Sequence, residues 1–292
     1  MLTLPRWDGA RVVVEPPGEV PGTWAGAPSA LRAGGDIYLA YRMRTAGERG
    51  YANVVARSSD GVEFTTVAVI GKERFGGASL ERPALTVTPE GRWRLYVSVA
   101  TPRTKHWRVD LLEADEPEAL AGAPAETVLP GSADEGVKDP VLLHDGRTWH
   151  LWASVHPLET DEHADRMTTK YATSPDGRAW QWRGVALAPR AGEWDARGVR
   201  VSAVWPTEGG LSVAYDGRAT AGENWEERTG TATAAQRPDG SYGPMTAAGA
   251  PPTGSPHAPH GLRYLTAVPG RIYYEGTRAD GAHELRTEET AG

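Results

Sequence analysis

Apolar and polar positions alternate along the chain in short runs that are separated by Gly turns. One arrangement recurs: an X-Pro step, an apolar strand, a turn containing Gly and a second strand rich in aromatic residues. Four segments show it: residues 26–41, 81–98, 138–154 and 257–275. Four prolines mark the copies, separated by 55, 57 and 119 residues: Pro28, Pro83, Pro140 and Pro259. Because the last gap is two periods, another copy is expected near residue 200, and residues 198–215 fit it without the proline.

A repeat of about 57 residues with four short strands is typical of a β-propeller blade. Asp-Gly turns between strand-like runs, at residues 60–61, 176–177 and 239–240, indicate the hairpins within the repeats. We therefore predict an all-β fold in which residues 1–292 form one domain, a five-bladed propeller with four-stranded antiparallel blades. The predicted blades span approximately these residues: 22–75, 76–131, 132–190, 191–250, and 251–292 together with 10–15.

The last repeat is one strand short. Only three strands are indicated before the chain ends, over residues 262–267, 271–277 and 282–287. An unpaired outer strand would expose backbone hydrogen-bonding groups. Residues 10–15 alternate like a strand, so we predict that this N-terminal segment pairs with residues 282–287 and closes the last blade.

The composition narrows the class of partner to a small molecule. A net charge of −7 and a pI of about 5.7 do not provide the basic surface that nucleic-acid binding needs, and no apolar run is long enough for a transmembrane helix. Without cysteine the chain has no disulfide, thiol nucleophile or thiolate metal site. The N-terminal residues lack the features of a signal peptide, so a cytoplasmic location is expected. The oligomeric state is left open.

In a propeller the first strand of each blade lines the central axis, so the residues before the marker prolines are the candidate site residues. These positions hold Ala27, Arg82 beside Glu81, Asp139 beside Lys138, Arg200 by alignment of the fourth copy, and Ala258 between His257 and His260. We expect Arg82, Asp139, Arg200 and His260 to share an axial pocket. Each has a structural alternative: Asp139 as an Asx-type cap of its strand, and the arginines as partners of nearby acids.

Tryptophan is unusually frequent, with 11 Trp against two Phe. Flat aromatic side chains suit the apolar faces of sugars, and three lie where they could serve as platforms: Trp24, Trp205 and Trp225. Four others lie within predicted strands, where packing between blades is expected: Trp93, Trp149, Trp152 and Trp180.

Residues 138–143 read Lys-Asp-Pro-Val-Leu-Leu, and residues 257–262 read His-Ala-Pro-His-Gly-Leu. These two segments resemble the third and fifth blades of the five-bladed furanosidase superfamily, in particular family 43 glycoside hydrolases and their relatives in families 32, 68, 117 and 130. The resemblance implies that Asp139 tunes the pKa of a general acid and orients the substrate. It also implies an axial His that helps to hold a metal ion or a water near His260. No other cofactor or metal site is predicted.

The chain departs from this family at its two catalytic positions. An inverting glycosidase needs a carboxylate base and a carboxylic acid on opposite faces of the sugar. The resemblance places them in the first and fourth blades, where this chain has Ala27 and Arg200. We therefore expect a glycoside-hydrolase-like enzyme in which Asp139 and Glu81 act as the acid/base pair. The substrate would be bound by the remaining candidates: Arg82, Arg200, His257, His260, Trp24 and Lys138.

Two other functions fit the same substitutions. The protein could bind a sugar or an anionic metabolite without cleaving it, or the pocket could serve another reaction in a biosynthetic pathway. Replacing two carboxylates with Ala27 and Arg200 makes the pocket more positive. For this reason we expect a small ligand with an acidic group in preference to a neutral furanoside.

Overall fold

The computed structural model describes residues 2–290, so the ends of the predicted domain at residues 1 and 291–292 lie outside it. β-Strands dominate the described chain, and the first two groups of four follow one another. The first comprises β2 (Trp24–Ala33), β3 (Asp36–Arg44), β4 (Ala52–Ser58) and β5 (Thr65–Gly71). The second comprises β6 (Leu80–Val87), β7 (Trp93–Ala100), β8 (Trp107–Ala114) and β9 (Ala125–Leu129).

Three further groups complete the described chain. The third comprises β10 (Glu135–His144), β11 (Trp149–Pro157), β12 (Thr168–Ser174) and β13 (Gln181–Leu187). The fourth comprises β14 (Gly198–Thr207), β15 (Gly210–Arg218), β16 (Arg228–Ala235) and β17 (Thr246–Ala247). The last comprises β18 (Leu262–Val268), β19 (Arg271–Thr277), β20 (His283–Glu289) and the N-terminal β1 (Arg11–Val14).

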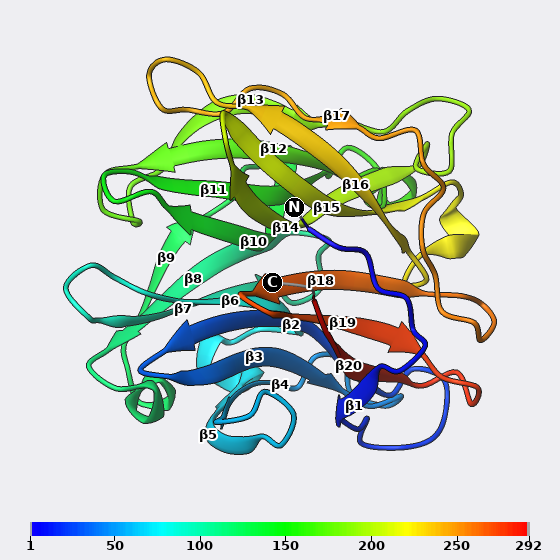
Figure 1. The fold of residues 1–292 in the computed structure, drawn as a ribbon, viewed down its shortest axis with the longest axis horizontal. Helices are drawn as coiled ribbons and strands as arrows, with labels where there is room; N and C mark the ends of the chain where they lie inside the picture. Colours follow the sequence, from blue (N-terminus) through cyan, green and yellow to red (C-terminus); the bar gives the residue numbers. More distant parts are fainter. Residues whose placement is uncertain (1, 291–292) are drawn as a thin grey trace.

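Consecutive strands within each group pair antiparallel, and a single parallel pair, Trp24 with His283, joins the first and last groups. The first strands lie nearest the middle of the molecule (Figure 1), and each contacts the next in the order β2, β6, β10, β14, β18 and back to β2. This closed ring confirms the predicted all-β propeller with four-stranded antiparallel blades. Its five first strands agree with the five predicted repeats.

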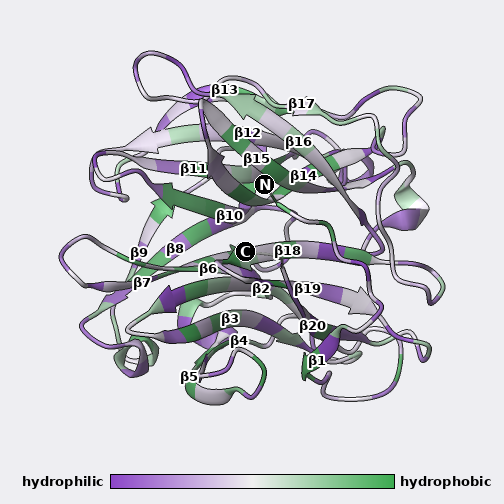
Figure 2. Cartoon of the chain, in the orientation of Figure 1, coloured by the Kyte–Doolittle hydropathy of each residue, from purple (hydrophilic) through white to green (hydrophobic). Residues whose placement is uncertain are grey.

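The apolar core is divided among the interfaces between neighbouring groups. Tyr38 and Val55 of the first group pack against Leu95 of the second, and Trp152 of the third packs with Val213 of the fourth. Comparable clusters fill the other interfaces. In Figure 2 the hydrophobic segments follow the strands, whereas the connecting loops are mostly hydrophilic. The predicted packing role of Trp93 and Trp152 between blades is confirmed, since both lie in these clusters.

The Asp-Gly turns are built from side-chain hydrogen bonds. The carboxylate of Asp60 accepts hydrogen bonds from the backbone N–H groups of Val62 and Glu63, at 2.8 and 2.9 Å. Asp176 makes the same contacts two repeats later, in the third group. The glycine that follows each aspartate has a positive φ, 77° at Gly61 and 72° at Gly177, which favours glycine at this place.

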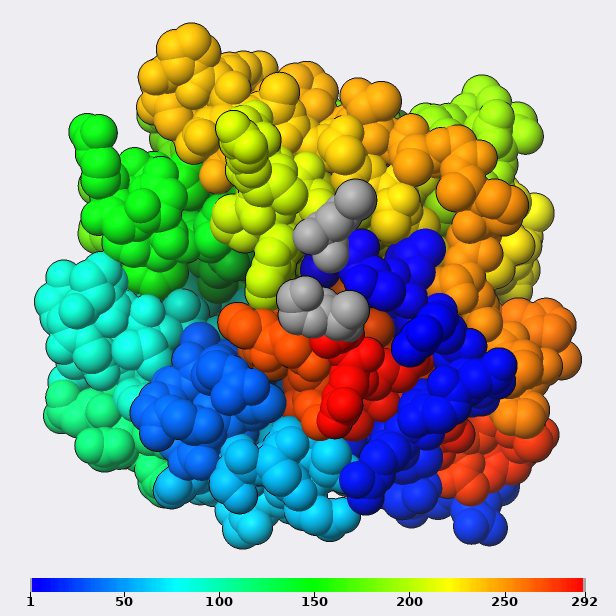
Figure 3. All heavy atoms as spheres, in the orientation of Figure 1, coloured from blue at the N-terminus to red at the C-terminus, as the bar shows by residue number. Residues whose placement is uncertain are grey.

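The N-terminal strand closes the last blade as predicted. β1 pairs antiparallel with β20, with Arg11 opposite Thr287 and Val12 opposite Arg286. Figure 3 shows the N-terminal segment, in blue, lying across the C-terminal strands, in red and orange. The Glu288 carboxylate also accepts hydrogen bonds from the backbone N–H groups of Arg6 and Trp7, at 3.0 and 2.9 Å. The two ends of the chain therefore hold the ring closed.

Because β1 closes the ring, a charge on its inner side should destabilise the whole protein. Val13 packs against the cluster between the first and last groups, whereas its neighbour Val12 does not contact that cluster. We expect Val13→Asp to lower the Tm by about 4–8 °C, which corresponds to roughly 2 kcal/mol in a chain of this size. Val12→Asp is the control and should have less than half this effect in differential scanning calorimetry. Equal effects would contradict the closing role.

Candidate functional site

A single tyrosine occupies the axis of the ring. Tyr264 of β18 is 1% exposed and has a φ of 55°, at a bulge where residues 264 and 265 interrupt the pairing of β18 with β19. Ala27 and Asp139 have positive φ at the corresponding bulges of β2 and β10. The repeated bulge turns one residue of each of these three strands toward the axis.

Four arginines, each from a different group of strands, surround this ring with their guanidinium ends. The carbon at the centre of the Arg200 guanidinium lies 3.7 Å from the ring centroid, and that of Arg263 lies 5.2 Å from it. Arg42 and Arg82 approach to 5.9 and 5.8 Å. A desolvated cation is attracted to the face of an aromatic ring, so Tyr264 serves as a shared partner for charges that would otherwise repel one another.

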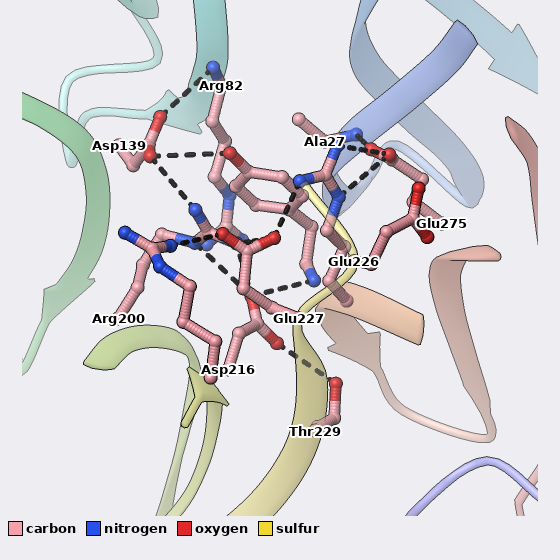
Figure 4. Close-up of polar contacts among 12 residues, drawn as sticks. Ala27, Arg82, Asp139, Arg200, Asp216, Glu226, Glu227, Thr229 and Glu275 are labelled. Carbon is pink, nitrogen blue, oxygen red and sulfur yellow. Dashed lines mark hydrogen bonds and ion pairs between the residues drawn. The ribbon is translucent and has the colours of Figure 1, made fainter. Parts of the chain in front are cut away.

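Acids from different groups alternate with these arginines, and we call this assembly the ion-pair belt (Figure 4). It consists of Arg42, Glu81, Arg200, Asp216, Arg218, Glu227, Arg263 and Glu275. Every member is at least 95% buried. Buried charges are tolerated only when they are paired, so the alternation of sign around the axis is a condition of the fold.

Two glutamates each bridge more than one arginine of the ion-pair belt. Glu275 lies 3.2 Å from a terminal guanidinium nitrogen of Arg42 and 2.8 Å from one of Arg263. Glu227 lies 2.7 Å from Arg263 and 2.6 Å from Arg218. These bridges connect strands β3, β15 and β18 with the loop before β16, so the belt holds several groups together at the axis.

The remaining acids complete the belt. Glu81 pairs with the Arg42 guanidinium. Asp216 lies 3.0 Å from a terminal nitrogen of Arg200, and it accepts hydrogen bonds from the Thr229 hydroxyl and from the backbone N–H of Tyr264, both at 2.9 Å. Each belt carboxylate therefore contacts at least one guanidinium.

The arginines set the protonation state of most belt acids. Burial by itself raises the pKa of Glu81, but the Arg42 guanidinium and the Lys138 ammonium outweigh it and lower the pKa to about 2. Burial also raises the pKa of Glu227 and that of Glu275, but nearby cations, Arg263 most strongly, outweigh it and hold both pKa values below the ordinary value. For Asp216 burial outweighs Arg200, and its pKa is raised. Glu81, Glu227 and Glu275 are thus fixed as carboxylates.

An open cavity of about 360 Å³, here called the axial cavity, lies over the belt. Belt residues and Tyr264 form its floor, and loop residues form its rim. Seven basic side chains line it: Arg42, Arg49, Lys105, Lys138, Arg200, Arg218 and Arg263. Four acidic side chains line it: Glu81, Asp161, Asp165 and Glu227. The lining therefore carries a surplus of positive charge.

The structure brings three of the predicted site residues together in the axial cavity: Glu81, Lys138 and Arg200. Asp139 does not line it. Its side chain is fully buried, 3.5 Å from the Lys138 ammonium, 3.6 Å from the Arg200 guanidinium and 3.4 Å from the Tyr264 hydroxyl. Figure 4 shows it beside the belt. Asp139 therefore positions cations, and the expectation that it lines the axial pocket is wrong.

Arg82 also lies away from the axial cavity. Its side chain is 2% exposed and lines a separate cavity on the other side of Tyr264. One terminal nitrogen donates hydrogen bonds to the backbone carbonyls of Ser202 and Pro28, at 2.7 and 3.3 Å. The expectation that Arg82 shares the pocket with Arg200 is wrong, because the side chain points along the axis in the opposite direction.

The two histidines that were expected at the axis lie away from it. β18 begins at Leu262, so Pro259 lies in the preceding loop and Tyr264 occupies the axial position. His260 is exposed, with Nδ1 2.9 Å from the carbonyl oxygen of Ser255, and His257 contacts the ring of Trp7. Neither lines the axial cavity. Within residues 2–290, no cluster of three or more His, Asp or Glu side chains has the geometry of a metal site.

Trp24 does not serve as a platform in the axial cavity. It is 3% exposed, stacks on His283 with ring centroids 4.8 Å apart, and has the Arg44 guanidinium 4.0 Å from its ring centroid. Trp225, the alternative candidate, is 42% exposed and lines the cavity. Trp24 thus lies outside the axial cavity and packs against arginines, and its contact with a ligand stays a prediction.

Arg42 was not singled out from the sequence, whereas Asp216 and Glu275 were expected only as acids that could reach the axis from the second strands of their repeats. Arg42, Asp216 and Glu275 lie at equivalent places near the ends of β3, β15 and β19, and each directly follows a tyrosine. This repeated Tyr-charged pair was visible in the second strand of three repeats. Glu227 lies in an irregular loop, and no pattern in the sequence indicates that it meets Arg263.

Comparison with known proteins identifies the fold. No family model and no curated protein matches the chain. Among solved structures, a thermostable family 43 glycoside hydrolase has a TM-score of 0.70 at 14% identity, over 96% of this chain and 93% of the other. A family 43 enzyme from Xanthomonas citri, complexed with xylose, has a TM-score of 0.68 at 15% identity, over 96% and 91% of the two chains.

A second class of enzyme shares the architecture. The β-1,2-mannobiose phosphorylase from Listeria innocua has a TM-score of 0.61 at 13% identity, over 98% of this chain and 92% of the other. At such low identities the likeness defines the fold alone. The chain has the propeller fold that these glycoside hydrolases and this phosphorylase share. In residues 2–290 no helix has the length and apolarity needed to cross a membrane.

Removing one bridging charge from the ion-pair belt should lower the stability of the protein strongly. Glu227→Gln leaves Arg218 and Arg263 without the carboxylate that pairs them. We expect the free energy of unfolding to fall by roughly 3–5 kcal/mol, as for other broken buried pairs. Glu126→Gln is the matched control, because Glu126 is half-exposed and pairs with Arg178 at the surface; it should change stability by less than about 1 kcal/mol. Equal losses in urea titrations would contradict the belt's structural role.

The lowered pKa values also predict acid sensitivity. Glu81, Glu227 and Glu275 stay ionised in the folded protein at pH values where the unfolded chain binds protons. Their stabilisation is complete above the unfolded pKa of about 4.3 and is lost as the pH falls toward the folded pKa, about 2 for Glu81. Each group contributes up to about 1.4 kcal/mol per pH unit in this window. Urea titrations from pH 5 to pH 3 should show this slope, reduced in Glu227→Gln; a flat profile would contradict it.

Proposed function

We propose that the axial cavity binds a small sugar or glycosylated metabolite that carries an acidic group, and that it does so by ion pairing without hydrolysing neutral glycosides. The observation that carries this proposal is the charge arrangement. The acids in the floor of the cavity already pair with belt arginines, whereas two cations on its walls, Arg49 and Lys105, have no such partner in the described structure. In the described structure no carboxylate forms an ion pair with Arg49 or Lys105, and both line the cavity.

Lys138 is the cation best placed between floor and rim. Its ammonium lies 3.5 Å from Asp139 and 4.9 Å from the ring centroid of Trp107, and its side chain is 14% exposed. An ammonium has three donors, and a single carboxylate at 3.5 Å leaves capacity for a ligand anion. Together with Lys105 it provides two ammonium groups in the lining of the cavity, in addition to the guanidinium groups of its floor.

Trp225 favours a ligand with a ring. It is 42% exposed at the rim of the cavity, and the Arg44 guanidinium lies 5.0 Å from its ring centroid. An exposed tryptophan held in place from behind presents a flat apolar face, which suits the apolar face of a sugar. The cavity therefore combines a stacking surface at its rim with anion-binding groups deeper inside, as expected for an acidic sugar.

The same geometry argues against hydrolysis of a neutral glycoside. A general acid must carry a proton near neutral pH, which requires a raised pKa. Glu81 lines the cavity, but its pKa is lowered to about 2. Asp216 has a raised pKa, but it is fully buried and does not line the cavity. Neither Glu81 nor Asp216 is therefore suited to donate a proton at the cavity surface.

Cleavage of an acidic glycoside is a second candidate. It is favoured by the neighbours of the same fold, which include glycoside hydrolases and phosphorylases, and by two rim acids that face the cavity, Asp161 and Asp165. Asp165 pairs with Arg197 at 2.8 Å. Asp161 forms no ion pair in the described structure and would be the acid available for catalysis.

Calorimetric titration with matched ligands tests the proposal. We expect glucuronate and galacturonate to bind, and glucose, galactose, arabinose and xylose to bind at least about tenfold more weakly, because only the acids engage the wall cations. Lys138→Met should weaken binding of the acids by about tenfold. Lys170→Met is the control, since Lys170 pairs with Glu135 away from the cavity lining.

The proposal also predicts that affinity for the acids falls as salt is added. It would be refuted by equal affinity for acidic and neutral sugars, or by rapid turnover of nitrophenyl arabinofuranoside, xyloside or fructoside. Turnover of a nitrophenyl glucuronide that is lost in Asp161→Asn would instead establish the second candidate.

A further inference from the structure

A second cavity, of about 150 Å³, lies at the other end of the axis and is here called the Arg82 cavity. In β10, Lys138 lines the axial cavity, whereas residues 140–142 line the Arg82 cavity. In β18, Arg263 lines the axial cavity and Thr266 lines the Arg82 cavity. Because the first strands run through the ring in one sequence direction, their later residues line the opposite end. All five first strands contribute to this lining: β2, β6, β10, β14 and β18.

Arg82 is a buried cation without a counter-ion. Its side chain is 2% exposed, and no ion pair in the described structure includes it, in contrast to the belt arginines. Asp139 contacts only the backbone N–H of Arg82, at 3.3 Å. Burial lowers the pKa of Arg82 to about 10, although Asp216 and Asp139 oppose this shift from a distance. A positive charge in this position is left largely uncompensated by the protein.

The cavity offers hydrogen-bond donors that the protein does not use. The Nε and one terminal nitrogen of Arg82 have no partner, and the buried hydroxyl of Ser202 has none. The hydroxyls of Ser29 and Thr266 each accept a hydrogen bond from a backbone N–H, of Leu85 and Ala30. Their own hydrogens are thus available to be donated.

No acid competes for these donors. Apart from Arg82, the lining consists of four hydroxyl residues and apolar side chains, with no carboxylate among them. Donors from a guanidinium and from hydroxyls, gathered around one uncompensated positive charge, match an acceptor that is itself negative. A water molecule would satisfy hydrogen bonds here but would leave the charge unbalanced.

We propose that the Arg82 cavity is a binding site for a small monovalent anion, either a halide or a short carboxylate such as formate. A single guanidinium balances one negative charge. The volume of about 150 Å³ is well below the 300–1,000 Å³ or so of pockets for larger ligands, which favours a small anion. The site is separate from the axial cavity and does not depend on the ligand proposed for it.

Anomalous diffraction from bromide-soaked crystals tests occupancy directly. The expected result is a bromide peak within hydrogen-bonding distance of the unpartnered Arg82 nitrogens, and its loss when excess formate is added to the bromide soak identifies the carboxylate as a competing occupant. A peak that persists in formate restricts the site to halides. A map that shows only water beside Arg82 at high bromide concentration would overturn the proposal.

Thermal unfolding tests the same site in solution. At equal ionic strength, chloride, bromide or formate at about ten times its dissociation constant should raise the Tm of the wild-type protein by about 3 °C relative to sulfate. Ser202→Ala removes one donor with little change in volume and should reduce this shift by at least half, and Arg82→Met should abolish it. Lys138→Met, which alters only the axial cavity, should keep it. Shifts of equal size in all four proteins would overturn the proposal.

Discussion

Alternation of positive and negative side chains around Tyr264 is the constraint on which the structure depends. Four arginines approach one aromatic ring at 3.7–5.9 Å. Three of them, Arg42, Arg200 and Arg263, are held there by carboxylates that lie between them. The bridging acids come from different groups of strands, so the belt links blades that the chain connects only through loops. Apolar clusters fix the packing of neighbouring blades, and the belt fixes how they meet at the axis.

The belt also determines what the axial cavity can do. In a glycosidase, carboxylates at the bottom of such a cavity carry out proton transfer. Here Glu81 and Glu227 hold arginines in place, and their pKa values are lowered as a result. The floor is thereby rigid and desolvated, and the wall cations above it supply the charge that a ligand meets. The fold is shared with glycoside hydrolases, whereas the charges of the cavity lining support the proposal that it binds an anion.

The repeat in the sequence predicted the fold well because local features determine the blade architecture. These features are the strand lengths, the Asp-Gly turns and the missing last strand. It placed Glu81, Lys138 and Arg200 in the axial cavity for the same reason. It failed for His257 and His260 because Pro259 lies in a loop, so the proline spacing is out of register with the axial bulge at Tyr264. Glu227 could not be predicted, because its partners lie on other strands.

A crystal structure of the protein with D-glucuronate tests the central claim most directly. The account predicts that the ligand carboxylate lies within about 4 Å of the Lys105 or Lys138 ammonium, with the sugar ring against Trp225 and no carboxylate of the protein on either side of the anomeric carbon. The account would be contradicted by a sugar whose anomeric carbon lies between Glu81 and a second carboxylate, with its acidic group directed into solvent.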